Sequence, residues 1–400
     1  HSLNRVVVAS CSPRTHQPLF SSSCEEAGLN PYLFEMVNIR DQCSWVHMQA
    51  KESGTEKAKE LVRMGVAKSA FLEPQENIHS SLVRKVIVIG GGMAGMSAAE
   101  SMASMGMDVI LVEKGPQLGG VLRSLHRLSP HMDQASDRIG ELVDKVEKHP
   151  RITTYLQANV QAVSGYIGNY QVSLDTQEGQ QSETVGCIVV ATGALPLQPE
   201  GLFGYDGRSV ITQMELEQRL AQGKVDAGKV VMIQCAGARI PEREYCSRIC
   251  CMVGVKNALL LKQHNPDMDV HILYRDMQMY GTDKEQMLWD ARGENICFDV
   301  YDPENPPRVE SGQVKFYHPL LGQEVDIDAD LVVLSTPMVA REDAPKISQM
   351  MRVPTDQNNF FLEAHAKLRP LDFAADGIFV CGSARYPATV EEARSQGIGV

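Results

Sequence analysis

Residues 86–120 read VIVIGGGMAGMSAAESMASMGMDVILVEKGPQLGG, and this stretch decides the fold. An apolar strand runs directly into Gly90, Gly92 and Gly95, which have the GxGxxG spacing, and an Ala/Met-rich helix follows. This is the strand–turn–helix context that a dinucleotide-binding turn requires. Gly90 permits the tight turn, Gly92 lets the backbone approach a pyrophosphate, and Gly95 permits close packing of helix on strand. The helix N-terminus then faces the anion.

Four segments continue this pattern along the chain. The strand DVILVE ends in Glu113, 23 residues after Gly90, where a carboxylate can accept hydrogen bonds from an adenosine ribose. The segment KGPQLGG follows at 114–120, VGCIVVATGALP stands at 185–196, and DGIFVCGSA stands at 376–384. The sequence therefore predicts one nucleotide site assembled from distant parts of the chain.

The order of these segments resembles the flavoproteins with two dinucleotide-binding domains, typified by thioredoxin reductase. That resemblance implies FAD rather than NAD in the first site. In that family an acidic residue after the last glycine contacts the flavin side of the cofactor, and here that position is Ser383, so we expect a weaker or different contact. The predicted cofactor-binding residues are Gly90, Gly92, Met93, Ala94, Gly95, Glu113, Lys114, Gly119, Gly120, Ala191, Thr192, Gly193, Gly382 and Ser383.

Compact β-rich apolar runs predict the rest of the fold. They are RVVVAS (5–10), KVIVIG (85–90), KVVMIQ (229–234) and LVVLST (331–336). Each precedes a turn or a helical pattern, which favours βαβ units and doubly wound sheets. We predict an α/β protein with two Rossmann-like, FAD/NAD(P)-binding type domains preceded by a small α/β N-terminal domain. The expected boundaries are 1–80 for the N-terminal domain, 84–200 for the FAD domain, 201–364 for the second Rossmann-like domain and 365–400 for a truncated return to the FAD domain.

Composition narrows the classes of function. The chain has 400 residues and a net charge of −12, and its basic residues are scattered, so we expect no nucleic-acid partner. No uninterrupted apolar run approaches the roughly 18 residues of a membrane span, and none is predicted. Without an export signal, the ten cysteines favour a reducing cytoplasm over a disulfide framework. The first residues lack an initiator Met, and we expect a piece of a longer chain.

Residues 235–251, CAGARIPEREYCSRICC, stand where a second nucleotide turn would be expected. One glycine remains there, so a pyrophosphate would meet Cβ atoms, and we expect no working nicotinamide site. The spacing C-x10-C-x3-C-C lacks the paired C-x2-4-C knuckles of zinc, which favours an iron-sulfur cluster. Buried unligated thiols remain an alternative. On a regular helix Cys251 would lie about 100° from Cys250, so four-fold ligation requires an irregular turn around Ile249.

Several blocks together resemble the A-type subunit of heterodisulfide reductase and its bacterial relatives, over nearly the whole chain. They are VVVASCSPRTHQPLF, AGLNPYLFEMVNIRDQCSWVH, the glycine turn, and QCAGARIPEREYCSRICCMVGVKNALLLK. The resemblance implies that Cys235, Cys246, Cys250 and Cys251 hold a 4Fe–4S cluster near the flavin. The ferredoxin-like CxxCxxC segments of full-length relatives are missing here. Cys11 and Cys43 belong either to a second, incomplete cluster site or to the structural core.

The same resemblance implies a cytoplasmic electron-transfer subunit in which FAD accepts an electron pair and releases single electrons through the cluster. It further suggests flavin-based bifurcation in a larger complex. The expected partners are other heterodisulfide reductase-type subunits and donors such as ferredoxin or hydrogenase and dehydrogenase subunits; a homodimer is left open. Two alternatives are an NAD(P)H-dependent flavin disulfide oxidoreductase and a non-catalytic flavin-binding scaffold stabilised by zinc.

Overall fold

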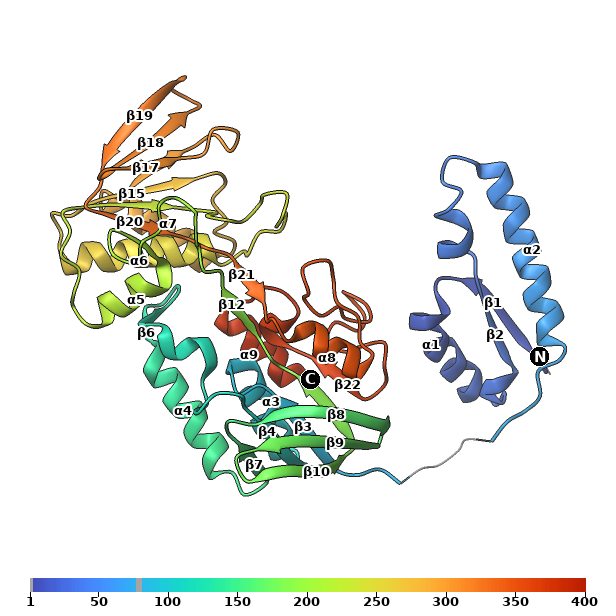
Figure 1. The fold of residues 1–400 in the computed structure, drawn as a ribbon. Helices are drawn as coiled ribbons and strands as arrows, with labels where there is room; N and C mark the ends of the chain where they lie inside the picture. Colours follow the sequence, from blue (N-terminus) through green and yellow to red (C-terminus); the bar gives the residue numbers. More distant parts are fainter. Residues whose placement is uncertain (1–2, 77–80) are drawn as a thin grey trace. The chain divides into compact units, whose positions relative to one another are not determined.

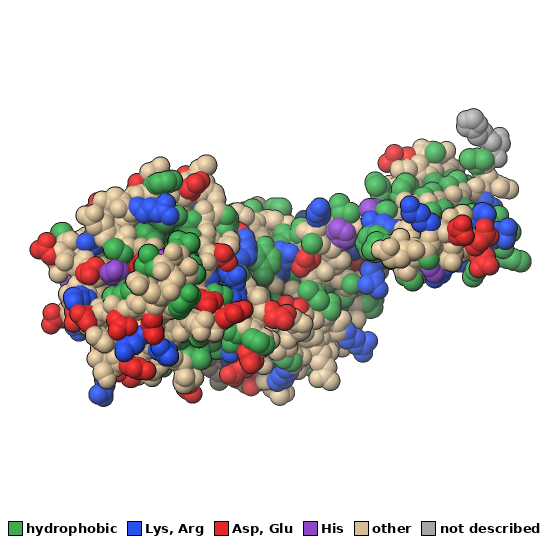
Figure 2. Space-filling view, turned by 90° about the horizontal axis from the view of Figure 1, so that it is seen from above, with side chains coloured by type: hydrophobic (Ala, Val, Ile, Leu, Met, Phe, Trp, Pro, Cys, Tyr) green, Lys and Arg blue, Asp and Glu red, His purple; other side chains and the backbone are tan. Residues whose placement is uncertain are grey.

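The structure, a computed structural model, describes residues 3–76 and 81–400 (Figure 1). The chain divides into two units, His1–Ser80 and Ser81–Val400. Lys, Arg, Asp and Glu side chains are intermixed over the face seen in Figure 2 rather than gathered by sign. Within the described ranges, no helix combines the length and the apolarity needed to cross a bilayer.

The first unit is a small α/β fold built on two parallel strands. The Val-rich strand β1 (Val6–Ser10) pairs with β2 (Phe34–Asn38). Helices α1 (Pro13–Glu26) and α2 (Lys51–Ser69) contact these strands. A short 3-10 helix, η1 (Pro31–Leu33), and a π-helical turn, η2 (Arg40–Ser44), complete the unit.

A five-stranded parallel sheet organises the first half of the second unit. Its strands, in sheet order, are β22 (Ile378–Val380), β11 (Cys187–Val190), β3 (Lys85–Ile89), β4 (Asp108–Val112) and β7 (Ile152–Tyr155). The predicted strands at 85–90, within 185–196 and within 376–384 thus lie side by side, with β3 at the centre. This order brings the carboxyl ends of β3, β4, β11 and β22 to one edge of the sheet.

Different layers cover the two faces of this sheet (Figure 1). Helices α3 (Met93–Ser104), α4 (Ala135–Lys148) and α9 (Val390–Gly399) pack in one apolar core with alternate strand residues. On the other face lies an antiparallel sheet of β8 (Asn159–Tyr166), β9 (Asn169–Thr176) and β10 (Gly179–Val185). A small hairpin of β5 (Arg127–Leu128) and β6 (Asp133–Gln134) precedes α4.

A second parallel sheet repeats the same layering. Its strands, in order, are β13 (Val210–Thr212), β20 (Leu331–Leu334), β14 (Lys229–Ile233), β15 (Asp269–Tyr274) and β16 (Cys297–Val300). Helices α5 (Gln213–Ala221), α6 (Cys250–His264) and α7 (Thr282–Gly293) cover one face. An antiparallel sheet of β17 (Arg308–Glu310), β18 (Gln313–His318) and β19 (Gln323–Asp328) covers the other. The prediction of two Rossmann-like halves is therefore confirmed.

The two halves are joined by β12 (Ala194–Pro196), which pairs antiparallel with β21 (Met338–Ala340). Helix α8 (Ala344–Met351) follows β21. Ile347, Met351 and Phe361 lie in the core of the first sheet, although we predicted them within the second domain at 201–364. The chain therefore returns to the first half well before residue 365, because these apolar side chains pack against its strands.

Candidate functional site

The glycine turn between β3 and α3 contains two positions at which a side chain would collide with the protein itself. Gly90 has φ +111°, and a Cβ there would overlap the Ala191 carbonyl group. A Cβ at Gly95 would overlap the Gly90 carbonyl oxygen, so helix α3 packs directly on the turn. These two glycines permit the tight turn and the close packing predicted for them.

Gly92 differs from its neighbours because it faces open space. Its backbone is extended, with φ −82° and ψ −173°, and a Cβ there would meet no atom within 4 Å. Gly92 is also the N-cap of α3 and supplies no side-chain cap. The first N–H groups of the helix are therefore available to an anion, as a pyrophosphate cradle requires.

A cavity of about 520 Å³ lies in front of this turn, within the range of ligand pockets. Twelve of the fourteen predicted cofactor-binding residues line it: Gly90, Gly92, Met93, Ala94, Glu113, Lys114, Gly119, Gly120, Ala191, Thr192, Gly193 and Ser383. Gly95 and Gly382 do not line it. Gly382 packs against Ala94 and donates its N–H to Gln396 Oε1 at 2.9 Å, so it supports the cavity from behind.

Polar groups in the cavity wall fit a nucleotide cofactor. In the described part of the chain, Thr192 Oγ1 and Asp343 Oδ1 are buried and lack a hydrogen-bond partner, and both residues line the cavity. Glu113 accepts the Gly91 N–H on Oε2 and the Gly115 N–H on Oε1, each at 2.6 Å. Its carboxylate thus fixes the turns on either side and keeps lone pairs for a ribose.

Lys114 and Ser383 have protein partners of their own. Lys114 Nζ lies 3.0 Å from Asp343 Oδ2, and Ser383 Oγ accepts the Ala388 N–H at 3.3 Å. Asp343 therefore brings a second carboxylate to the cavity, besides Glu113. Nothing in the sequence around Asp343 indicated this position, because it depends on the return of α8 to the first half.

A buried ion pair that the sequence reasoning missed also lines the cavity. Lys256 and Glu217, from α6 and α5, are in contact and each side chain is 1% exposed. Lys256 Nζ also donates to the Arg127 carbonyl at 3.0 Å, and Glu217 Oε2 accepts the His126 N–H at 2.9 Å. Burial lowers the pKa of Lys256. The one signal in the sequence is a lysine within the apolar run of α6.

The connection after β14 is unlike the glycine turn of the first half. Only residues 90–92 separate β3 from α3, whereas residues 234–249 separate β14 from α6. Cys235, Arg239 and Arg248 have φ of +60°, +56° and +63°, so this cysteine loop is irregular throughout. Helix α6 begins at Cys250. The chain is therefore irregular up to Arg248, and Cys250 and Cys251 are the first two residues of the regular helix α6.

The cysteine loop and the start of α6 bring four thiols to one small cavity; below, "cysteine loop" includes Cys250 and Cys251. Cys235, Cys246, Cys250 and Cys251 all line this cavity, together with Arg239 and Asp276 among others. Burial raises the pKa of Cys235 and Cys250, and raises that of Cys251 to about 12. Burial therefore favours the neutral form of these three thiols, whereas a coordinated metal deprotonates a thiol outright. Cys250 and Ile249 also line the larger cavity, so the two sites are adjacent.

The four sulfurs of the cysteine loop, and the distances between them, indicate which metal this site can bind. Four thiolates are the usual ligands of iron-sulfur clusters. A single tetrahedral zinc ion, with Zn–S distances of about 2.3 Å, needs sulfurs about 3.8 Å apart. Among the described residues, Asp269, His271 and Cys297 have ligand atoms that all lie within 4.8 Å of one another. No three sulfurs of the cysteine loop lie that close together.

The remaining glycine of the cysteine loop does not form a cradle. Gly237 has φ +81°, and a Cβ there would lie 2.8 Å from Leu197 Cδ2 and 3.0 Å from Leu202 Cδ1. Its neighbours Ala236 and Ala238 are buried. The loop backbone therefore packs against leucines of the chain itself, where Gly92 faces open space.

In the first unit, Cys43 is buried in η2 and donates its thiol to the Gly54 carbonyl at 2.9 Å. Cys11 follows β1 and is half-buried. This hydrogen bond accounts for Cys43 as a core residue. The alternative of a second cluster site for the two cysteines stays a prediction.

The chain is similar in sequence to a family of flavoprotein reductases. The family model for pyridine nucleotide-disulphide oxidoreductase matches residues 84–397. The second A-type iron-sulfur subunit of CoB–CoM heterodisulfide reductase from Methanopyrus kandleri is 34% identical over 500 residues, covering 99% of this chain and 75% of that protein. The A-type subunit of H(2):CoB-CoM heterodisulfide,ferredoxin reductase from Methanothermobacter thermautotrophicus is 34% identical over 497 residues, with the same two shares. The predicted resemblance is confirmed.

Thioredoxin reductase of Lactococcus lactis has a similar fold, with a TM-score of 0.55 and 18% identity over 78% of this chain and 95% of that chain. This likeness concerns the fold alone. The alignment to the Methanopyrus kandleri protein, over 500 residues, is longer than the 400 residues of this chain. At least 100 residues of that protein within the aligned region therefore face gaps in this chain.

Proposed function

The chain belongs to the family of A-type heterodisulfide reductase subunits, within the pyridine nucleotide-disulphide oxidoreductases, and is an FAD-dependent oxidoreductase. From this premise we propose that it transfers electrons between FAD in the larger cavity and a 4Fe–4S cluster in the cysteine loop. When bound, FAD supplies the exchange between electron pairs and single electrons, and the cluster supplies single-electron transfer.

The observation that carries this proposal is the position of Cys250. This residue lines both the cavity in front of the glycine turn and the small cavity of the four thiols. A cofactor held by Gly92 and a cluster held by Cys250 would therefore share one protein wall. Such adjacency provides a direct route for electrons without a mobile carrier.

The residues of the chain hold and separate the two groups. Gly92 and the first N–H groups of α3 would receive the pyrophosphate, while Thr192 Oγ1 and Asp343 Oδ1 would be available to the rest of the cofactor. Cys235, Cys246, Cys250 and Cys251 are the proposed ligands. Arg239 and Asp276 both line the small cavity and form an ion pair at 2.7 Å, and nearby charge is one of the factors that set a cluster potential.

The geometry favours this function over both alternatives. An NAD(P)H-dependent reductase needs a second pyrophosphate cradle, and Gly237 instead packs on Leu197 and Leu202. A zinc scaffold needs closely spaced sulfurs, and within the described ranges no three sulfurs of the loop lie within 4.8 Å of one another.

We extend the proposal to partners. The relative from Methanothermobacter thermautotrophicus is named as part of a heterodisulfide,ferredoxin reductase. By analogy we propose that this chain works with other heterodisulfide reductase-type subunits and with a ferredoxin-type or hydrogenase-type donor. Bifurcation at the flavin, a homodimer and a cytoplasmic location stay predictions.

Iron analysis of single cysteine variants tests the cluster. Anaerobically reconstituted protein should bind about four irons, as a four-Cys cluster requires, and Cys→Ala changes at 235, 246, 250 and 251 should each lower that content. The matched control is Cys24→Ala, since this half-buried cysteine of α1 lies outside the loop. Normal iron in all four loop variants, or zinc in place of iron after reconstitution with both metals, would contradict the proposal.

A further inference from the structure

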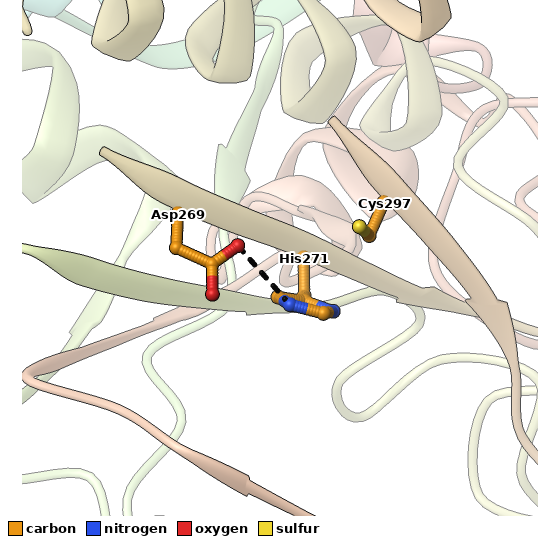
Figure 3. Close-up of side chains that lie close together, drawn as sticks. All are labelled: Asp269, His271 and Cys297. Atoms are coloured by element: carbon orange, nitrogen blue, oxygen red, sulfur yellow. Dashed lines mark ion pairs between the residues drawn. The ribbon is translucent and has the colours of Figure 1, made fainter. Parts of the chain in front are cut away.

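A second group of metal-ligating side chains lies on the other parallel sheet, outside the cysteine loop (Figure 3). Asp269 and His271 are two residues apart on β15 and so point to the same face of the sheet. Cys297 is the register partner of His271 on the neighbouring strand β16. Strand register alone therefore places a carboxylate, an imidazole and a thiol side by side.

We propose that Asp269, His271 and Cys297 form a binding site for a zinc-type divalent metal ion. One ligand atom from each residue lies within 4.8 Å of the other two. His271 Nε2 is 3.3 Å from Asp269 Oδ1. Two ligands at about 2.0–2.1 Å from a tetrahedral zinc ion are about 3.4 Å apart, so these two atoms already have the separation that a shared ion requires.

Asp299 supplies the orienting contact that metal-binding histidines usually have. His271 Nδ1 lies 3.1 Å from Asp299 Oδ2. With the proton on Nδ1 donated to this carboxylate, the lone pair of Nε2 is directed toward Asp269. A carboxylate behind the imidazole in this way fixes its tautomer and raises its basicity. The other oxygen of Asp299 lies 3.9 Å from His318 Nε2 on β18, which is beyond hydrogen-bond distance.

The donor set indicates the class of metal. A thiolate, an imidazole and a carboxylate together suit a borderline ion such as Zn²⁺, whereas Mg²⁺ and Ca²⁺ prefer oxygen ligands alone. Asp269 and Cys297 are both exposed. An ion can therefore enter from solvent, and three protein ligands leave a fourth position for water.

The competing interpretation is a surface ion-pair network. In that case His271 bridges Asp269 and Asp299 as a charged imidazolium, and Cys297 is a bystander. The two interpretations differ in the role of the thiol, because an ion-pair network does not need it, whereas a zinc-type site loses one of its three ligands without it.

The test uses the anaerobic chain with its flavin and iron bound, after dialysis against metal-free buffer. Zn²⁺ is titrated into this protein, and binding is measured by calorimetry. Iron analysis before and after shows that the cysteine loop stays occupied. We expect one Zn²⁺ per chain. His271→Gln and Cys297→Ser should abolish this binding, and Asp299→Asn should weaken it by about 10- to 100-fold, as is usual for an orienting carboxylate. Co²⁺ in place of Zn²⁺ should give a thiolate-to-cobalt absorption band that Cys297→Ser removes.

Asp267→Asn is the matched control, because this exposed acid lies two residues before Asp269 and outside the trio. It should bind Zn²⁺ as the unchanged chain does, and flavin content should be normal in every variant. Absence of saturable Zn²⁺ binding in the unchanged chain would overturn the proposal. Unchanged affinity in both His271→Gln and Cys297→Ser, or a cobalt spectrum without a Cys297-dependent band, would overturn it equally.

Discussion

At the scale of single residues, the three glycines of the first turn are not all glycine for the same physical reason. Gly90 and Gly95 are required by the fold, because a Cβ at either would overlap backbone atoms. Gly92 is not, since its extended backbone suits any residue and a Cβ there meets nothing within 4 Å. Besides the general preference for glycine at a helix N-cap, a bound ligand that approaches the backbone gives a reason for glycine at this position.

Gly92→Val should therefore fold normally and lose its flavin. The added side chain would occupy the space through which a pyrophosphate reaches the N–H groups of α3. We expect affinity for FAD to fall at least about tenfold, which corresponds to about 1.4 kcal/mol of lost contact. The measurement is flavin content and FAD titration of the apoprotein.

Gly140→Val is the matched control, because Gly140 is exposed on α4 and a Cβ there also meets no atom within 4 Å. It should keep its flavin. If Gly92→Val retains full flavin affinity, the cofactor does not lie against this turn.

Lys256 and Glu217 are the second residue-scale feature. Both side chains are almost fully buried, and they join α6, α5 and the segment around Arg127. Breaking a buried pair leaves an uncompensated charge, which costs about 3–5 kcal/mol. Lys256→Met and Glu217→Leu should each lower the free energy of unfolding by about that amount, measured by urea denaturation.

The double variant Lys256→Met/Glu217→Leu is the informative control. It buries no unpaired charge, so it should lose far less stability than the two single losses combined. Additive losses, or single losses below about 1 kcal/mol, would mean that the two side chains do not act as a pair.

At the scale of elements, Arg248 links the cysteine loop to the first half of the unit. Its backbone N–H donates to Cys246 Sγ at 3.3 Å, and its side chain donates to Glu392 Oε1 on α9 at 2.7 Å. The guanidinium also lies 5.2 Å from the ring centroids of Tyr280 and Tyr386. Arg248 thus holds the loop against the helix that closes the flavin domain.

Arg248→Ala should loosen the loop without removing its thiols. Half-exposed ion pairs and cation–π contacts are each worth up to about 1 kcal/mol. A total of about 1–2 kcal/mol corresponds to about 5- to 30-fold more frequent opening. Hydrogen exchange in peptides covering 235–249 should accelerate by that factor, while iron content stays near four per chain.

Arg292→Ala is the comparison, because Arg292 stacks on Trp289 at 5.1 Å on α7, away from the loop. It should leave exchange in the loop unchanged. Unaltered exchange in Arg248→Ala would show that the loop is held by its own packing, and equal acceleration in both variants would show a general loss of stability.

At the scale of the whole molecule, what could be predicted followed from local signals. Apolar runs of Val, Ile and Leu at 85–90, 229–234 and 331–336 became β3, β14 and β20, because short runs of this composition are typical of buried parallel strands. The GxGxxG spacing correctly located the cavity, because it marks a turn at which the backbone leaves room for a ligand. The placement of these strands in two sheets with the same layers followed from the βαβ rule.

Features that depend on contacts across the chain could not be predicted. Lys256 and Glu217 are 39 residues apart and become partners only when α5 and α6 pack. Asp343 and Phe361 reach the first half because the chain returns along β21, which no local pattern announces. Gly382 was predicted to bind the cofactor, but it does not line the cavity. A Cβ at Gly382 would lie 2.6 Å from Ala94 Cβ, so the glycine is required by its packing against α3.

The central claim is that the segment at the position of a second nucleotide turn holds a cluster that transfers single electrons instead of binding a nicotinamide. Anaerobic stopped-flow mixing of the flavin- and iron-loaded chain with NADPH, NADH and a reduced viologen tests it most directly. The account predicts that the viologen reduces the cluster and the flavin together, and that neither nicotinamide bleaches the flavin at a comparable rate. Rapid, stoichiometric bleaching of the flavin by NADPH or NADH would contradict the account and favour an ordinary nicotinamide-dependent reductase.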